Sequence, residues 1–163
     1  MIRPARESDV AAIAAIWTPI VRETALTFLP EPHSDAAIAQ MIATAPVFLV
    51  AEQDGALAGF VKAGPFRSGQ GYRHSAEHTI LLAPRARGQG TGRALMAALE
   101  ARLAGQGCHA LVAGISAENP EAVAFHARLG FTRVGHLPEV GRKFDRWIDL
   151  LLMQKLLSPG DPR

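Results

Sequence analysis

Apolar residues recur along this chain with two different periods, and together they predict helices and strands in mixed order. Spacings of three and four residues predict helices that start at Asp9 under a Ser8 cap, extend from a Ser34 cap to Thr44, span residues 93–103, and run from Asn119-Pro120 to Leu129-Gly130. Proline lacks the N–H that a helix interior uses, so we expect Pro19 to kink or restart the first helix.

Short apolar runs between polar, glycine or proline residues predict strands at residues 2–5, 47–52, 56–63, 77–83, 109–115, 131–137 and 147–153. Gln53-Asp54-Gly55 predicts a β-hairpin between the second and third of these strands. Residues 24–32 and 64–71 are expected to be loops. The pattern contains no repeat, low-complexity tract or linker, and so predicts one mixed α/β domain over residues 1–157 with a frayed tail at 158–163.

Composition narrows the class of protein. A chain of 163 residues with 48% hydrophobic residues is typical of one globular domain with a sizeable core. The net charge is +2 and the basic residues are scattered, which argues against a nucleic-acid partner. A single cysteine, Cys108, excludes an intramolecular disulfide, and we expect a buried, inert thiol. No apolar run approaches a membrane span or a signal peptide, so we expect a cytoplasmic protein.

The strongest chemical signal is the glycine-rich segment at residues 87–92, Arg-Gly-Gln-Gly-Thr-Gly, between a predicted strand and a predicted helix. Glycine lets the backbone approach an anion closely, and the first N–H groups of the helix point toward it. A P-loop would end in Gly-Lys-Ser/Thr, whereas Gly92-Arg93-Ala94 supplies no hydroxyl for magnesium. The glycine spacing also differs from a Rossmann fingerprint. Some other phosphate-bearing ligand is therefore indicated.

The glycine segment resembles the pyrophosphate-binding motif of the GNAT superfamily of N-acetyltransferases. Asn119 stands where this family expects an asparagine, and His126 stands seven residues later, where it usually has a tyrosine. A histidine before Leu129-Gly130-Phe131 resembles the branch of phosphinothricin and methionine sulfone acetyltransferases. Residues 24–28, 72–78 and 140–154 resemble other segments of that branch, although Asp145 stands where the branch usually has glycine.

The resemblance implies an α/β (α+β) GNAT fold, with a central mixed, mostly antiparallel, splayed sheet flanked by helices. It implies acetyl-CoA as co-substrate, no metal, and a homodimer. Backbone groups of a splayed strand and of the glycine turn, together with an asparagine, would bind the cofactor, which here means Ile80, Leu81, Leu82, Arg87, Gly88, Gln89, Gly90, Thr91, Gly92, Arg93 and Asn119. A plain helix cap is the alternative role for Asn119.

Acetyl transfer needs a base that deprotonates the amine and a group that protonates or stabilises the departing thiolate. We expect Glu77 to be the base, directly or through a water, because partial burial could raise its pKa; a solvated carboxylate is the alternative. His126 would protonate the thiolate or bind substrate, unless it is simply packed. His78 should point to the opposite face from Glu77. The expected substrate contacts are Phe28, Tyr72, Arg73, Lys143 and Trp147, of which Arg73 suits a carboxylate or phosphinate.

The leading hypothesis is thus an acetyl-CoA-dependent enzyme that acetylates a small amino acid such as phosphinothricin, methionine sulfone or methionine sulfoximine. Two alternatives stay open from the sequence. One is an acetyltransferase for another small amine, such as a polyamine or an aminoglycoside. The other is a non-catalytic acyl-CoA-binding module, which would keep the glycine turn without needing the base. Phe28 and Trp147 could also be core residues, and Lys143 could be solvated.

Overall fold

The computed structural model of this chain, which describes residues 1–157, contains one seven-stranded sheet in the order β1-β2-β3-β4-β5-β7-β6. The strands are β1 (Ile2–Pro4), β2 (Val47–Gln53), β3 (Ala56–Pro65), β4 (Ser75–Leu82), β5 (Ala110–Ser116), β6 (Thr132–Lys143) and β7 (Arg146–Leu156). Within the described range only β4 and β5 are parallel neighbours. The mixed, mostly antiparallel sheet that the sequence predicted is confirmed; the predicted frayed tail lies outside the described residues.

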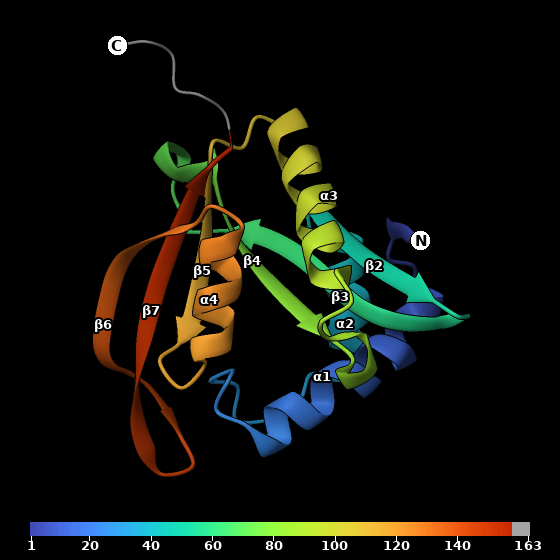
Figure 1. Cartoon of the computed structure of the whole chain (residues 1–163), viewed down its shortest axis with the longest axis horizontal. Coiled ribbons are helices and arrows are strands. Elements are labelled where there is room, and N and C mark those ends of the chain that lie inside the picture. The colour runs from blue at the N-terminus through green and yellow to red at the C-terminus, as the bar shows by residue number, and fades with distance from the viewer. Residues whose placement is uncertain (158–163) are drawn as a thin grey trace.

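Helices flank both faces of the sheet (Figure 1). They are α1 (Val10–Glu23), α2 (Asp35–Thr44), α3 (Thr91–Gly105) and α4 (Pro120–Arg128). Short 3-10 segments precede α1, β4 and α3: η1 (Glu7–Asp9), η2 (Gln70–Tyr72) and η3 (Pro84–Ala86). One buried cluster packs α1 and α2 against Phe48, Val50 and Phe60, and another packs α3 against Leu49, Val61 and Leu111. Alternate residues of β2 and β3 thus point to opposite faces, and both faces are buried. None of the helices in residues 1–157 has the length and apolarity needed to cross a bilayer.

Local sequence signals specify several of these elements. The Ser34 hydroxyl accepts a hydrogen bond from the N–H of Ala37 at 3.2 Å and caps α2 as predicted. The predicted hairpin turn is confirmed, with Asp54 and Gly55 both at positive φ (53° and 76°), as a two-residue turn between right-twisted strands requires.

The start and the interior of α1 differ from the prediction. Ser8 does not cap this helix, because it lies inside η1 and Asp9 is the N-cap of α1; the Asp9 carboxylate instead accepts the N–H of Arg6 at 2.8 Å at the start of η1. The helix also does not restart at Pro19, and it is continuous to Glu23. Pro19 and Ala15, whose carbonyl loses its helical partner, are both exposed, so water can hydrate that carbonyl.

Two strands are longer than the apolar pattern indicated. β4 begins at Ser75 rather than at residue 77, and β6 extends past Leu137 to Lys143. The second half of β6 has no apolar alternation and is exposed except at Gly141 and Lys143, and its ladder with β7 is interrupted between Leu137 and Gly141, where Glu139 has a positive φ of 53°. A two-residue reversal at Phe144 and Asp145, both at positive φ, joins it to β7. Register with β7, not apolar periodicity, therefore defines this strand.

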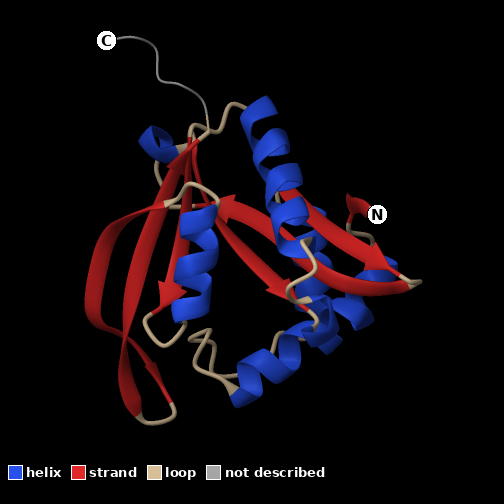
Figure 2. Cartoon of the chain, in the orientation of Figure 1, coloured by secondary structure: helices blue, strands red, loops and turns tan. Residues whose placement is uncertain are grey.

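The parallel strands β4 and β5 separate along their length. They pair from Ser75–Ala110 to His78–Ala113, and the pairing ends there. Beyond this point β4 pairs with β3 alone and β5 pairs with β7 alone, so each strand leaves one edge of its backbone unpaired. Figure 2 shows the two strands diverging from their common end. The splay that the sequence led us to expect is confirmed, and it opens the sheet at its centre.

Candidate active site

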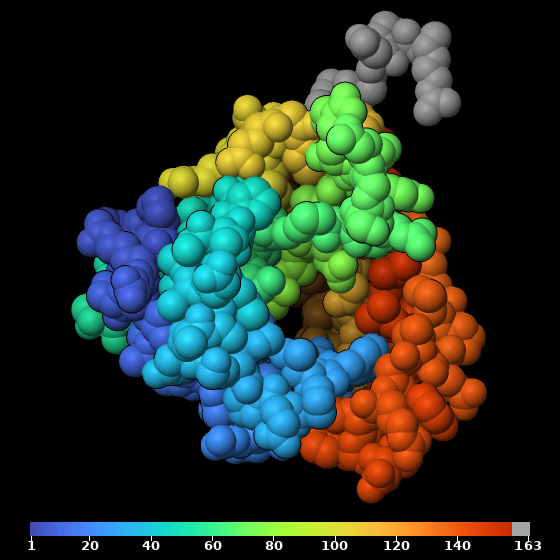
Figure 3. All heavy atoms as spheres, turned by 180° about the vertical axis from the view of Figure 1, so that it is seen from behind, coloured from blue at the N-terminus to red at the C-terminus, as the bar shows by residue number. Residues whose placement is uncertain are grey.

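A cavity of about 840 Å³ lies at the point where β4 and β5 separate. On one face of the sheet its walls come from α1, α2 and the loop between them, and on the other face from α3, α4 and the glycine turn. Figure 3 shows a hollow bordered on one side by the segment after α1 and on another by the strands β6 and β7. The cavity thus connects the two faces of the sheet and can hold two reactants that meet at the splay.

The glycine turn forms one end of the cavity. Gly88 and Gly90 have positive φ values of 74° and 83°, and a Cβ atom added to either would meet nothing within 4 Å. Gly90 is the N-cap of α3, so the first N–H groups of this 15-residue helix are directed out of the turn. Arg87 and Arg93 line the same end. Open backbone, a helix N-terminus and two guanidinium groups are suited to a pyrophosphate.

Two residues of the glycine turn do not reach the main cavity. Gln89 and Thr91 line a separate, smaller pocket beside β1 and β2. The Gln89 amide donates to the carbonyl of Arg85 at 2.8 Å and accepts from the Gln53 side chain at 2.8 Å. Gln89 therefore ties the turn to the end of the β2–β3 hairpin, and any cofactor contact from these two positions comes from their backbone.

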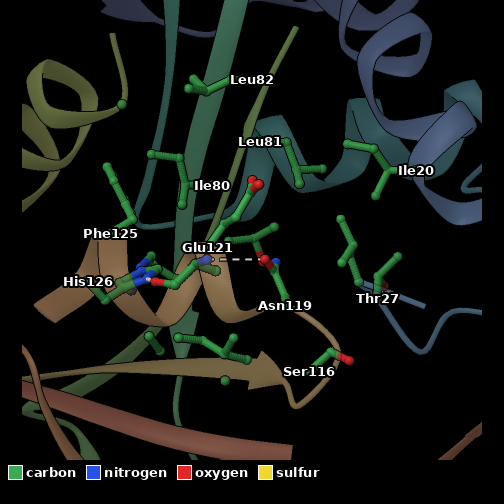
Figure 4. Close-up of a pocket in the computed structure, with 18 of the residues that line it drawn as sticks. Ile20, Thr27, Ile80, Leu81, Leu82, Ser116, Asn119, Glu121, Phe125 and His126 are labelled. Atoms are coloured by element: carbon green, nitrogen blue, oxygen red, sulfur yellow. Dashed lines mark hydrogen bonds between the residues drawn. The ribbon is translucent and has the colours of Figure 1, made fainter. Parts of the chain in front are cut away.

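The splayed edge of β4 forms the middle of the cavity. Ile80, Leu81 and Leu82 all line it, and Figure 4 shows Ile80 on the side of Phe125 and His126, while Leu81 points toward Ile20. Because β5 has turned away, the backbone groups on this edge have no strand partner. An extended polar chain could pair with them as an added strand does.

Asn119 stands opposite this edge and has a structural role of its own. Its Oδ1 accepts the N–H of Ala122 at 3.1 Å and caps α4, as the dashed line in Figure 4 marks. The cap uses only the carbonyl oxygen of the side chain, so the NH₂ group can still donate to a ligand. The helix cap and the cofactor contact proposed from the sequence are therefore compatible.

Glu77 lies at the centre of the cavity, on the face that α1 and α2 cover. Burial raises the pKa of its carboxyl, and the positive charge of Lys62 partly opposes that shift. The carboxylate remains accessible because the protein atoms around it line an open cavity. Glu77 thus has the placement and the direction of pKa shift that a general base needs.

His78 points to the opposite face, as predicted, and pairs there with His126. Their Nε2 atoms are 2.9 Å apart, and both rings are buried against Phe131. Nδ1 of His126 lies 2.7 Å from the carbonyl oxygen of Ala122, so this nitrogen must carry a proton. Burial lowers the pKa of both rings, that of His78 to about 3. In the neutral pair the His126 Nε2 therefore accepts a hydrogen bond from the Nε2–H of His78, and the buried Nδ1 of His78 has no hydrogen-bond partner.

Of the five side chains predicted to contact substrate, only Phe28 lines the cavity of this chain. Tyr72 is exposed on η2 beneath Arg67, and Arg73 is exposed next to it. Trp147 is exposed under the Arg142 guanidinium, 4.7 Å from the ring centroid. The structure therefore does not bring Tyr72, Arg73 or Trp147 together with Phe28 and Glu77 within one chain.

Lys143 is neither solvated nor at the cavity surface. Only 6% of its surface is exposed, and Nζ donates to the carbonyl of Thr27 at 2.9 Å. The neighbouring Gly141 packs under Phe28 so closely that an added Cβ would lie 2.5 Å from the ring. Lys143 and Gly141 of β6 thus hold in place the loop after α1, which forms one wall of the cavity.

The sequence also missed residues that line the cavity. Trp17, Ile20 and Met41 form an apolar wall, and His33 and Lys62 add polar groups to it. Lys62 lies within an apolar strand segment, and only the register of β3 against β4 brings it to the cavity. Hydrophobic periodicity alone carries no signal for that pairing.

Comparison with known proteins identifies relatives over nearly the whole chain. The family model "Acetyltransferase (GNAT) family" matches residues 13–131. An L-amino acid N-acyltransferase, MnaT, of Escherichia coli is 40% identical over 96% of this chain and 94% of its own length. A phosphinothricin N-acetyltransferase of Alcaligenes faecalis is 38% identical over 98% of this chain and 84% of its own length.

The fold is equally similar to solved structures. A GNAT superfamily phosphinothricin acetyltransferase of Sinorhizobium meliloti, solved in complex with AcCoA, superposes with a TM-score of 0.90. The two sequences are 32% identical, and the match covers 96% of this chain and 87% of the other. The match therefore spans nearly all of the fold described above, from α1 and α2 on one face of the sheet to α3 and α4 on the other.

Proposed function

This chain belongs to the acetyltransferase (GNAT) family, and on that premise we propose that it acetylates the amino group of a small amino acid. It is an acetyl-CoA-dependent N-acetyltransferase. The proposed acceptor is of the phosphinothricin, methionine sulfone or methionine sulfoximine type, which the names of relatives 34–38% identical give as their substrates. The observation that supports the proposal best is the single cavity that joins a phosphate cradle to the accessible carboxylate of Glu77.

The residues of the cavity fit acetyl-CoA. Backbone N–H groups from Gly88 to Arg93 would hold the pyrophosphate, and the open edge of β4 at residues 80–82 would hydrogen-bond the pantetheine arm. Asn119 would donate to the same arm through its amide. The bound cofactor supplies an acetyl thioester, which an unprotonated amine can attack. We propose direct transfer that needs no metal.

Glu77 would remove the proton from the amine, either directly or through a water. It lies on the face of the sheet where Trp17, Ile20 and Phe28 form an apolar acceptor end, so the amine would approach from that face. Burial keeps the pKa of the carboxyl above that of a solvated glutamate, which makes it a stronger base for this step.

We propose that His126 acts mainly as a wall and contact for the acetyl end of the cavity. In the neutral His78–His126 pair, neither ring nitrogen of His126 offers a proton to the cavity, since Nδ1–H faces Ala122 and Nε2 accepts from His78. Protonation of the departing thiolate by His126 would first require this pair to open. The roles proposed for Tyr72, Arg73, Lys143 and Trp147 in substrate binding stay predictions.

A test follows the release of free CoA with a panel of amines. We expect turnover with L-phosphinothricin, L-methionine sulfone and L-methionine sulfoximine, and much less with polyamines or aminoglycosides. Glu77→Gln should abolish most turnover while CoA still binds. An acyl-CoA-binding module would bind CoA and show no acetyl-CoA-dependent thiol release with any amine in the panel.

We further propose a homodimer located in the cytoplasm. Several large apolar side chains are exposed on β6, β7 and the turn between them: Val134, Leu137, Val140, Phe144, Trp147 and Leu156. Six large apolar side chains left exposed along one hairpin favour association with another chain. A buried, reduced Cys108 is consistent with a reducing compartment. A monomeric mass in sedimentation analysis at working concentration would contradict the dimer.

A further inference from the structure

Lys62 lies beside the proposed base, on the same face of the sheet. In the ladder between β3 and β4, Lys62 pairs with Thr79 and Gly64 pairs with Glu77. Directly paired residues point to the same face, so Lys62 and Glu77 are diagonal neighbours, a relation that typically separates residues by about 7–8 Å and their Cβ atoms by somewhat less. Both side chains line the cavity. A cation and an anion are thus placed side by side with room between them for a ligand.

The Lys62 ammonium has no hydrogen bond or ion pair to a protein group within residues 1–157. The two other lysines of the chain do have partners: Lys143 donates to the Thr27 carbonyl at 2.9 Å, and Lys155 bonds the Glu100 carboxylate at 2.7 Å. Burial lowers the pKa of Lys62, and the charge of Glu77 opposes that shift. A half-buried charge without a close partner is costly, and a bound anion would remove that cost.

Lys62 is also the cation of the acceptor end. Among the described residues that line this end, the polar side chains are Thr27, Thr79, His33 and Glu77, and the pKa of His33 is lowered by burial and by the charge of Lys62. The arginines that line the cavity, Arg87, Arg93 and Arg128, belong instead to the glycine turn, the first turn of α3 and the last turn of α4. The cofactor end therefore has its own cations, and Lys62 remains for the acceptor.

We propose that Lys62 determines acceptor specificity by binding the α-carboxylate of the amino acid whose amino group faces Glu77. This inference rests on the proposed function. In an α-amino acid the amino and carboxylate groups are attached to the same carbon, so they can reach diagonal neighbours on one sheet face at the same time. The ion pair with Lys62 orients the amine, and the apolar residues of the acceptor end receive the side chain.

The test compares an amino acid with its primary amide. L-Methionine sulfone and L-methionine sulfone carboxamide are assayed with the parent protein and with Lys62→Met, well above the pH at which Glu77 titrates. We expect kcat/KM to fall roughly 10- to 100-fold for the acid, as for loss of a charged hydrogen bond, and less than threefold for the amide. Because each substrate is compared with itself, the lower basicity of the amide cancels.

Lys155→Met is the matched control, since it removes a lysine that does not line the cavity. It should change kcat/KM for acid and amide by the same factor. If Lys62→Met lowers kcat/KM by the same factor for both substrates, the residue acts through Glu77 or through folding, and the inference is overturned. If kcat/KM for the acid does not change, the inference is overturned as well.

Failure of the proposed function would look different. If the parent turns over neither compound, calorimetric titration of the acid and the amide in the presence of CoA decides the role of Lys62. Binding of the acid to the parent, with at least tenfold weaker binding to Lys62→Met and no such difference for the amide, supports the inference without catalysis. No binding of the acid to the parent, or equal binding to both proteins, overturns it.

Discussion

Gly114 on β5 lies directly against the carboxylate of Glu77 on β4. A Cβ atom added to Gly114 would be 2.8 Å from Oε1 of Glu77 and 3.7 Å from the Leu150 side chain. Glu77 pairs with Val112 in the parallel ladder, so Gly114 is the next residue of β5 on the same face. The space for the base thus depends on the absence of a side chain on the neighbouring strand.

Gly114→Ala should therefore displace the carboxylate and reduce kcat by about 100-fold, the cost of moving a catalytic group by about an ångström. The KM for acetyl-CoA should stay within about twofold. Gly64→Ala is the control, because Gly64 pairs with Glu77 on β3 but an added Cβ meets nothing within 4 Å. Steady-state kinetics of both variants tests this, and equal kcat values would contradict it.

The acidic limb of the pH profile should report Glu77. A protonated carboxyl cannot accept the amine proton, so kcat/KM should fall as pH decreases through a pKa above 4.5, the ordinary value for glutamate. The charge of Lys62 lowers this pKa, so Lys62→Met should move the limb to higher pH. Rates of CoA release with an amide acceptor between pH 4.5 and 9 measure the acidic limb of the parent and that of the variant. A limb that moves to lower pH in the variant would contradict this electrostatic coupling.

Much of the fold was predictable because its signals are local. The Ser34 cap, the Asp54-Gly55 turn and the glycine segment before α3 each depend on the conformational preferences of one to six consecutive residues. The alternation of strands and helices then restricted the fold class. The family resemblance rested on the glycine segment, on Asn119 and His126 and on short segments at residues 24–28, 72–78 and 140–154, and it added the splay of β4 from β5.

The remaining site residues depend on contacts between distant segments. Lys62 reaches Glu77 only through the β3–β4 register, and the connecting segment of residues 66–74 contains no apolar pattern that would specify it. Lys143 is buried because its ammonium finds the Thr27 carbonyl, 116 residues earlier in the chain. The His78–His126 pair likewise joins a strand to a helix 48 residues later. Composition and spacing cannot specify such partners.

Removal of the Lys143 ammonium should loosen the wall of the acceptor end. Lys143→Met keeps an apolar stem but leaves the Thr27 carbonyl without its donor, which should lower the free energy of unfolding by about 1–3 kcal/mol. Urea denaturation measures this loss. The KM for the amine should rise more than the KM for acetyl-CoA, because the loop borders the acceptor end alone. Lys155→Met, which removes a more exposed ion pair, should cost less than about 1 kcal/mol. Parent-like stability of Lys143→Met would argue against a role for this contact.

The buried His78 should make the protein sensitive to mild acid. Its pKa is about 3 in the folded protein, whereas an ordinary histidine has a pKa of 6.5. Between these two pH values the unfolded chain therefore binds more protons than the folded one. Stability should therefore fall as pH decreases, by about 2 kcal/mol from pH 7 to pH 5 for this residue. His126 contributes in the same direction.

His78→Gln isolates this effect. Urea unfolding of the parent and the variant at pH 7 and pH 5 gives four free energies, and the variant should lose less stability between the two pH values. Any general destabilisation by the substitution cancels in that difference. An identical pH dependence in both proteins would show that His78 is not buried in its neutral form.

Gly90 should be essential for the cofactor grip because of its backbone conformation. It occupies the left-handed region at φ 83°, where a side chain costs about 1–2 kcal/mol, and as the N-cap of α3 it sets the direction of the first N–H groups of the helix. In Gly90→Ala the turn would either retain this strain or change conformation and misdirect those groups. We expect the Kd for CoA in calorimetric titration to rise about tenfold or more. Gly105→Ala, at the other end of the same helix, adds a methyl group in open space without positive φ and should leave the Kd unchanged. An unchanged Kd in Gly90→Ala would mean that the pyrophosphate is held by the guanidinium groups of Arg87 and Arg93 rather than by the helix N-terminus.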